Sequence, residues 1–275
     1  MKVSVIVAVY KDFRNLELIL ETLSYQTYKN FEVVVVEDGK MLEMQRCIEN
    51  ARTQYDFVIK HTTQEDLGVR KARSQNNGLL AADGEYLIFI DGDCLLYSTF
   101  IQGHLSLAQE NVVLSGRRVN IPISLVPEIK NGNLKVKDIE DHYISKYFMW
   151  IFNFQVRYRQ GIRLKVDSWL YKLISKRNMS ISLLGCNFSC FKKDIVAING
   201  FDESYGETAI PDDMDLEWRF QAYGLEIHSC KNIANMFHLD HKIHDRGDAT
   251  PLLEVMKKRK EDNKFICSDG LNTHL

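Results

Sequence analysis

The chain has 275 residues, of which 45% are hydrophobic and 26% charged, so its composition excludes a disordered, collagen-like or mucin-like chain. Its 35 lysines and arginines and 37 aspartates and glutamates give a net charge of -2, which provides no general electrostatic basis for binding nucleic acid. This length is enough for one large α/β domain or for two smaller domains.

The N-terminal run, residues 3–9, is short and apolar, with a single lysine before it and no small-residue cleavage site after it. We therefore expect a buried strand there and no signal peptide. No stretch approaches the roughly 18 to 20 consecutive apolar residues that cross a bilayer. The six cysteines show neither a paired CxxC spacing for zinc nor a dense disulfide pattern. These features predict a cytoplasmic protein.

Short apolar runs alternate with helical periodicity in the first part of the chain. Residues 16–23 carry apolar side chains at helical spacing, and residues 101–108 repeat the pattern. Strands buried on both faces are expected at residues 3–9, 31–36, 57–59, 86–90 and 112–114. This alternation predicts an α/β fold with a mostly parallel, Rossmann-like sheet flanked by helices.

The alternating pattern stops after Val119. Residues 120–182 contain two of the four prolines and no clear strand, so we expect an inserted helical segment there. Strand-like character returns at residues 183–191 and 225–228, and residues 252–265 predict a polar helix.

An aromatic face marks the inserted segment. At helical spacing this face carries Tyr147, Trp150, Ile151, Phe154 and Tyr158. Several lysines and arginines lie around it within residues 142–177. Such a combination favours either an amphipathic segment that contacts anionic lipid or a lid helix packed against the protein itself or a second subunit.

Polar side chains follow three of the predicted strands, at the edge where open parallel sheets bind their ligands. Ala8 and Tyr10 end the first strand, Asp38 follows the second, and Asp91-Gly92-Asp93 follows the fourth. Taken alone, an Asp-Gly-Asp triplet is an ordinary turn. Carboxylates crowded at one edge repel one another, however, and a bound divalent cation is the usual reason for such crowding. We therefore expect a cation site in this crevice.

The order of these motifs resembles one known family. VSVIVAVY, VVVVEDG and NNGLLAADGEYLIFIDGD are similar to the nucleotide-sugar half of the inverting family 2 glycosyltransferases, which have the glycosyltransferase A (GT-A) fold. LGCNFSCF, NGFDESY, DDMDLEWR and MFHLDH resemble the second half of the chondroitin-polymerase and galactosyltransferase-like branch. The resemblance implies a single domain in which residues 1–119 bind the nucleotide sugar, residues 120–182 form the insertion and residues 183–275 bind the acceptor and supply the base.

The resemblance also implies an activity. It is the metal-dependent inverting transfer of a hexosyl or N-acetylhexosaminyl group from a nucleoside diphosphate sugar to a hydroxyl of a glycan, with UDP favoured as the nucleotide and GDP left open. The cofactor would be Mn²⁺ or Mg²⁺, and the setting would be the synthesis of a surface polysaccharide such as lipopolysaccharide or capsule. A lipid-linked acceptor, peripheral contact with the inner face of the cell membrane and an oligomeric state stay open, and no nucleic-acid partner is expected.

The family motifs assign roles to individual residues. The implied nucleotide-sugar contacts are Ala8, Tyr10, Asp38, Arg70, Asn76, Asp91 and Gly92. Sugar contacts are implied for Gly185, Asn187 and Asp212. The implied metal ligands are Asp91, Asp93 and His238, with His241 and His244 as rivals of His238. Inverting transfer needs a base opposite the leaving group, and Asp213 matches that residue of the family.

Each assignment has a plainer alternative. Acidic residues in a first helical turn are often caps or partners of the helix dipole, and a lone buried histidine is often only hydrogen-bonded core. The chain also departs from the family pattern, because Asp212 stands for a glutamate and Gln75 for an arginine. The rival functions are a nucleotidyltransferase, which usually has a Gly-rich basic loop that residues 10–13 lack, and a non-catalytic sugar-binding module.

Overall fold

The computed structural model describes residues 1–150, 161–175, 181–206, 212–241 and 248–274. A seven-stranded sheet in the order β3-β2-β1-β4-β8-β6-β9 forms its centre. In chain order its strands are β1 (Val3–Val9), β2 (Phe31–Glu37), β3 (Val58–Thr63), β4 (Tyr86–Asp91), β6 (Val112–Ser115), β8 (Asn187–Phe191) and β9 (Glu226–Ser229). Within this sheet β8 runs antiparallel to both its neighbours, whereas the other pairs are parallel. The predicted mostly parallel α/β sheet is confirmed.

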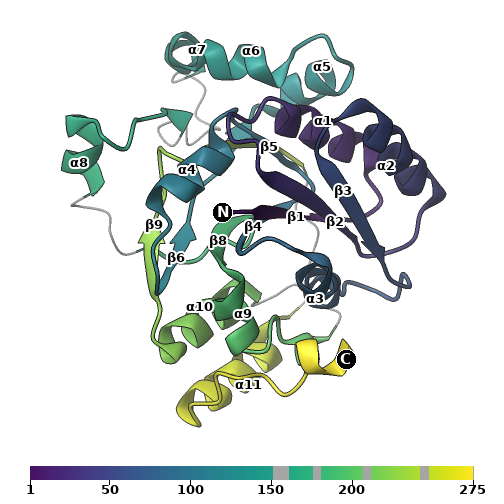
Figure 1. Ribbon diagram of the computed structural model, residues 1–275, viewed down its shortest axis with the longest axis vertical. Helices are drawn as coiled ribbons and strands as arrows, with labels where there is room; N and C mark the ends of the chain where they lie inside the picture. The colour runs from purple at the N-terminus through teal and green to yellow at the C-terminus, as the bar shows by residue number, and fades with distance from the viewer. Residues whose placement is uncertain (151–160, 176–180, 207–211, 242–247, 275) are drawn as a thin grey trace.

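Helices cover both faces of this sheet (Figure 1). They are α1 (Phe13–Ser24), α2 (Leu42–Gln54), α3 (Lys71–Ala81), α4 (Phe100–Leu107), α9 (Lys192–Ala197) and α10 (Asp212–Tyr223). Helix α11 (Thr250–Glu261) lies farther out, beyond α10 (Figure 1). Helices α1 and α2 lie together on one side of the sheet, and α3, α9 and α10 lie on the other. The chain therefore folds as three layers, helix, sheet and helix.

The alternation of side chains along each strand explains the two core layers. In β1, Val5 and Val7 point toward α1 and α2, whereas Ile6 points toward α3. Both faces of β1, β2 and β4 are covered, so these strands are nearly continuous hydrophobic runs rather than alternating ones. Each fully buried aliphatic side chain contributes about 1.5–3 kcal/mol relative to exposure. Helix α3 approaches closely because Gly78 has no Cβ, which would lie 2.5 Å from Cγ1 of Val36.

A second, three-stranded sheet was not predicted. It has the order β5-β10-β7 and consists of β5 (Cys94–Leu96), β10 (Met236–Leu239) and β7 (Val119–Ile121). These strands have three or four residues each, too few for a clear sequence period. The small sheet nevertheless decides the site, because β10 lies antiparallel to β5 with His238 opposite Cys94.

The inserted segment is helical, as expected. Its described elements are η1 (Ile123–Leu125), α5 (Val126–Lys130), α6 (Val136–Asp141), α7 (Tyr143–Trp150) and α8 (Trp169–Ser175). The expected aromatic face of Tyr147, Trp150, Ile151, Phe154 and Tyr158 lies outside the part of the chain whose side chains are described. Within the described ranges, no helix combines the length and the apolar composition needed to cross a membrane.

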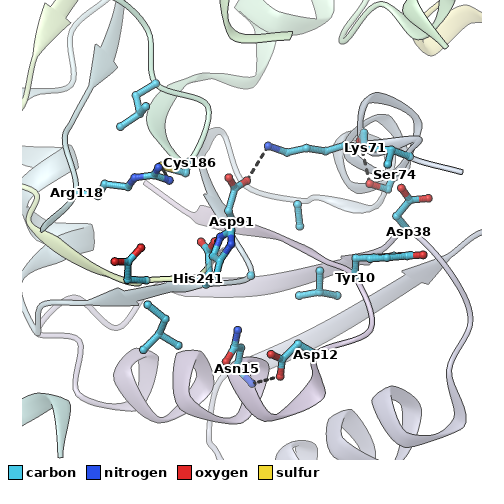
Figure 2. A pocket seen from close by; sticks show the side chains of 18 of the residues that line it. Tyr10, Asp12, Asn15, Asp38, Lys71, Ser74, Asp91, Arg118, Cys186 and His241 are labelled. Atoms are coloured by element: carbon cyan, nitrogen blue, oxygen red, sulfur yellow. Dashed lines mark hydrogen bonds and ion pairs between the residues drawn. The ribbon is translucent and has the colours of Figure 1, made fainter. Parts of the chain in front are cut away.

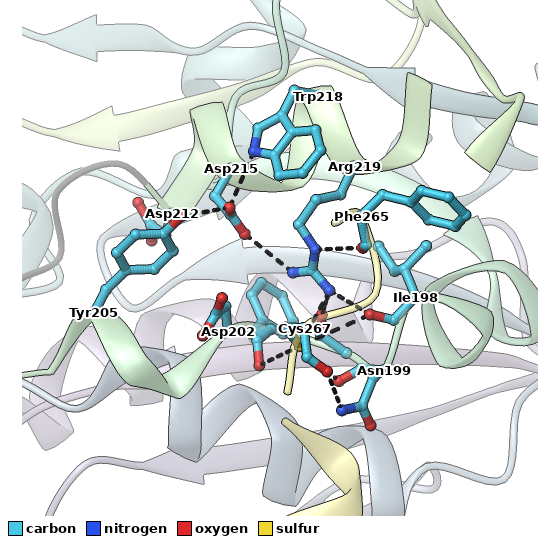
Figure 3. Close-up of polar contacts among 12 residues, drawn as sticks. Ile198, Asn199, Asp202, Tyr205, Asp212, Asp215, Trp218, Arg219, Phe265 and Cys267 are labelled. Carbon is cyan, nitrogen blue, oxygen red and sulfur yellow. Dashed lines mark hydrogen bonds and ion pairs between the residues drawn. The ribbon is translucent and has the colours of Figure 1, made fainter. Parts of the chain in front are cut away.

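A buried ion pair ties the C-terminal segment to α10 (Figure 3). Arg219 is 1% exposed, and its Nη1 lies 3.0 Å from Oδ2 of Asp215. The same guanidinium donates from Nε to the carbonyl of Phe265 and from Nη2 to the carbonyl of Gly200, both at 2.9 Å. Oδ1 of Asp215 accepts from the Tyr205 hydroxyl at 2.7 Å. A buried pair with its hydrogen bonds satisfied holds the start of α10 in place, whereas losing one partner would be strongly destabilising.

Candidate functional site

A cavity of about 640 Å³ opens at the carboxyl ends of β1, β2 and β4 (Figure 2). Because β1 lies between β2 and β4, the loops that follow these strands meet at one place. Of the predicted site residues, the cavity lining includes Ala8, Tyr10, Asp38, Asp91, Gly92, Asp93, Asp212 and Asp213. The cavity therefore brings together residues from both halves of the chain.

Tyr10 and Asp38 form one end of this cavity. The Tyr10 side chain is 50% exposed, and its hydroxyl donates to Oδ1 of Asp66 at 3.3 Å. Asp38 is buried and accepts from Nε2 of Gln64 at 2.6 Å and from the backbone N–H of Arg70 at 2.7 Å. The Arg70 guanidinium donates instead to the carbonyl of Glu65. Arg70 thus reaches the site through its backbone, by fixing Asp38, and its charged group does not line the cavity.

Lys71, the first residue of α3, reaches into the middle of the cavity. Its Nζ lies 2.8 Å from Oδ1 of Asp91 and 3.7 Å from Oδ2 of Asp212. Burial alone would lower the pKa of this amine, but the nearby carboxylates, Asp91 first, raise it well above its ordinary value. The lysine therefore stays charged and links Asp91 at the end of β4 to Asp212 at the start of α10. The sequence prediction missed it and chose the neighbouring Arg70.

Asp93, His238 and His241 form a cluster whose ligand atoms all lie within 4.8 Å of one another. Nε2 of His238 lies 3.0 Å from Oδ2 of Asp93, and Nε2 of His241 lies 3.1 Å from the same oxygen. Burial opposes ionisation of Asp93, yet the hydrogen bond from His238 holds its pKa far below the usual range. Asp91 is turned toward Lys71 instead. His244 lies outside the described residues.

This cluster fits a divalent cation on chemical grounds. One carboxylate oxygen and two imidazole nitrogens form a mixed donor set of the kind that Mn²⁺ accepts. Nδ1 of His238 is buried and has no hydrogen-bond partner among the described residues, and Nε2 shares a proton with Asp93, so a cation bound here would replace that proton. We therefore read Asp93, His238 and His241 as the candidate metal ligands.

Two adjacent carboxylates, Asp212 and Asp213, begin α10 and line the same cavity. Burial, assisted by the charges of Asp213 and Asp91, raises the pKa of Asp212 to about 6, although Lys71 opposes this rise. Asp213 also lines the cavity. It packs so closely on Gly185 that a Cβ there would lie 2.0 Å from Oδ1 of Asp213. Gly185 therefore makes room for the carboxylate.

Two predicted contacts are not at the cavity. Asn76 is fully buried, accepts from the backbone N–H of Phe201 and donates to its carbonyl, each at 2.9 Å. Asn187 is also fully buried, with Oδ1 3.1 Å from Nε2 of His104 and Nδ2 donating to the carbonyl of Arg117 at 2.9 Å. Their amides hold separate segments of the protein together, so the structure does not bring these two residues to the cavity with the other predicted site residues.

Comparison with known proteins agrees with this geometry. Residues 4–172 match the family model for glycosyl transferase family 2. The amylovoran biosynthesis glycosyltransferase AmsB of Erwinia amylovora is 29% identical over 157 residues, which cover 55% of this chain and 52% of that protein. The cholesterol galactosyltransferase of Borreliella burgdorferi is 32% identical over 101 residues, covering 37% of this chain and 27% of that protein. The matches therefore span about half or less of these relatives.

Solved structures share the fold at low sequence identity. The S. aureus TarS fragment 1–349 in complex with UDP-GlcNAc has a TM-score of 0.59 and 16% identity, covering 99% of this chain and 69% of that one. The mannosyltransferase PcManGT from Pyrobaculum calidifontis, in complex with GDP-Man and Mn²⁺, has a TM-score of 0.58 and 15% identity, covering 96% and 62%. Both carry the GT-A fold that the sequence motifs imply. The family model extends over most of the chain, and the matched residues include the strand ends that form the cavity. The protein therefore belongs to glycosyl transferase family 2.

Proposed function

We propose that this protein is a metal-dependent inverting glycosyltransferase that moves a hexosyl or N-acetylhexosaminyl group from a UDP-sugar to a hydroxyl of a glycan. One observation carries the proposal: Asp93 and His241, which form a cluster with the buried His238, line the same cavity as Asp213. A cation site and a carboxylate base within one cavity are what transfer from a nucleoside diphosphate sugar requires. The name of AmsB refers to amylovoran biosynthesis, and we propose a comparable role in surface polysaccharide synthesis.

The proposal divides the cavity between donor and acceptor. Ala8, Tyr10 and Asp38 would hold the nucleoside, with the Asp38 carboxylate toward the ribose or the base. Asp93 and the two histidines would hold Mn²⁺, and the ion would neutralise charge that develops on the departing nucleoside diphosphate. Residues 1–119 would thus supply the nucleoside side, and residues 183–275 would supply the acceptor side together with the two histidines of the metal site.

Asp213 is the proposed base. Its carboxylate takes the proton of the acceptor hydroxyl while that oxygen attacks the anomeric carbon from the face opposite the diphosphate. The bond from the anomeric carbon to the diphosphate oxygen breaks with its electron pair, and the new glycosidic bond has inverted configuration. Asp212, held beside Lys71, would keep the acceptor in place. Asp215 cannot serve, because both its oxygens are bonded within the buried network.

A donor panel tests the proposal. The protein is incubated with Mn²⁺ and a set of UDP- and GDP-sugars without acceptor, and the release of nucleoside diphosphate is measured. We expect slow hydrolysis selective for one UDP-sugar. A nucleotidyltransferase would instead join a nucleoside triphosphate to a sugar phosphate and release pyrophosphate from the triphosphate. A binding module would show affinity for the donor without any turnover, and either result would contradict the proposal.

We further propose that the enzyme acts at an anionic membrane surface, where a lipid-linked acceptor is available. Trp169 is 75% exposed and Ile144 is 64% exposed on the inserted segment, which is rich in lysine and arginine. Exposed aromatic and aliphatic groups beside cations suit a lipid interface.

Vesicle co-sedimentation provides the test of this docking. The protein should pellet with anionic vesicles at low salt and be released at high salt, because each cation near such a surface contributes about 1 kcal/mol that salt screens. Trp169→Ser should weaken the binding and leave donor hydrolysis unchanged. Equal behaviour toward anionic and neutral vesicles would instead assign the segment to a lid or a subunit contact.

A further inference from the structure

The lysines and arginine that line the cavity differ in their partners. Lys71 is paired with Asp91 at 2.8 Å, and Lys130 is paired with Asp12 at 3.1 Å. Within the described ranges, Arg118 makes no ion pair with a carboxylate. The hydrogen bond it does make there runs from Nη1 to Sγ of Cys186 at 3.7 Å. Among these three lining cations, Arg118 is therefore the one without a carboxylate ion pair in the described residues, although the charge of Asp93 acts on it from a distance.

A thiol is a poor partner for a guanidinium. The group has five N–H donors in a planar fork, whereas sulfur is a weak acceptor. Arg118 is also partly buried, so part of its hydration is lost without a strong hydrogen bond in exchange. The neighbouring Arg117 shows the contrast, since it donates to the carbonyls of Gly116 at 2.6 Å and Ser182 at 3.2 Å. Arg117 has a structural role, and the fork of Arg118 is available to a ligand.

The position of Arg118 indicates which part of a ligand it meets. In Figure 2, Tyr10 and Asp38 lie on one side of Asp91 and His241, and Arg118 lies with Cys186 on the other side. Arg118 directly precedes β7, which pairs with β10, the strand that carries His238. A donor with its nucleoside at Tyr10 and its diphosphate at the candidate metal ligands would place its sugar toward Arg118.

We propose that Arg118 binds an oxyanion, a carboxylate or a phosphate, on the sugar that is transferred or on the sugar that accepts it. The proposal rests on the proposed function. A guanidinium fork matches both oxyanions through two parallel hydrogen bonds. The substrate class is therefore an acidic or phosphorylated sugar, and Arg118 is the residue that selects it.

Two arms of one calorimetric experiment distinguish the sources. In the donor arm, UDP-glucuronic acid and UDP-glucose are titrated with Mn²⁺ present. In the acceptor arm, the affinities for methyl glucuronide and glycerol 3-phosphate are compared with the affinity for methyl glucoside. These titrations are made twice, once on the protein saturated with UDP and Mn²⁺ and once on the protein without nucleotide. We expect the anionic compound to bind about 10- to 100-fold more tightly than its neutral counterpart in one of the two arms. That arm identifies whether the donor or the acceptor carries the oxyanion.

Variants make the test specific to the guanidinium. Arg118→Gln should abolish this discrimination and leave the affinity for UDP unchanged. Arg118→Lys should restore part of it, because the charge remains but the fork is lost. Arg46→Gln, at an exposed position of α2, should behave as wild type.

The assignment would be overturned if the wild type did not discriminate in either arm, or if the discrimination survived in Arg118→Gln. A loss of UDP affinity in Arg118→Gln would also overturn it, because that result would place the guanidinium on the diphosphate. Failure of the wild type to bind UDP or any UDP-sugar would refute the proposed function separately. In that case, the acceptor-arm titrations of the protein without nucleotide still test the role of Arg118.

Discussion

Asp213→Asn should lower turnover by roughly 10² to 10⁴-fold while the affinity for UDP in the presence of Mn²⁺ stays nearly unchanged. The amide keeps the shape of the side chain and its packing on Gly185, but it cannot accept a proton from the acceptor hydroxyl. The loss should appear in kcat, measured with excess donor and acceptor, because the missing step belongs to the transition state. Calorimetry with UDP measures the unchanged ground-state binding.

Asp212→Asn is the matched comparison, since it removes the neighbouring carboxylate from the same helical turn. We expect a smaller loss in kcat together with a raised KM for the acceptor. Asp248→Asn, at an exposed position far along the chain from both, should behave as wild type. If Asp213→Asn keeps most of its turnover and Asp212→Asn loses it, then Asp212 is the base, and its raised pKa would account for that role.

Removal of the metal should abolish transfer, and addition of Mn²⁺ should restore it. Asp93→Ala should reproduce the effect in part, with weaker UDP binding and a loss in kcat on the order of 10²-fold or more, because one ligand of the leaving-group cation is gone. The measurements are turnover in excess chelator, turnover after metal is returned, and UDP affinity with and without Mn²⁺.

Single alanine variants at His238 and His241 test which imidazoles belong to the site. Both should raise the Mn²⁺ concentration needed for half-maximal activity, with the larger effect at the buried His238, which is 4% exposed. Full activity in excess chelator would refute the metal assignment. Dependence on His241 alone would place His238 in the core.

The parts of the fold that the sequence predicts well are those with a long, regular pattern. The apolar runs of β1, β2 and β4 identify the parallel sheet, and their adjacent order brings Tyr10, Asp38 and Asp91 to one edge. This much follows from local side-chain periodicity and from a general rule of parallel sheets.

The remaining features depend on tertiary contacts that leave no local pattern. His241 joins His238 because the short pairing of β10 with β5 fixes where the following loop runs. Asn76 matches a family motif, yet its amide is taken up by Phe201, a residue far along the chain. Lys71 could have been found from the expected start of α3, since the first residue of that helix lies at the ligand edge. Nothing local in the sequence distinguishes Arg118 from Arg117.

The place of β8 in the sheet bears on how the protein is made. Strand β8 lies between β4 and β6, although β6 precedes it in the chain, and it pairs Leu87 with Cys190. During synthesis, β4 therefore leaves the ribosome with an open, apolar edge that stays unpaired until residues 187–191 follow. Such an edge is a template for pairing with other chains. The nascent chain should thus need chaperone protection over this interval, and a chain stopped at residue 172, where the family match ends, should aggregate rather than form a smaller enzyme.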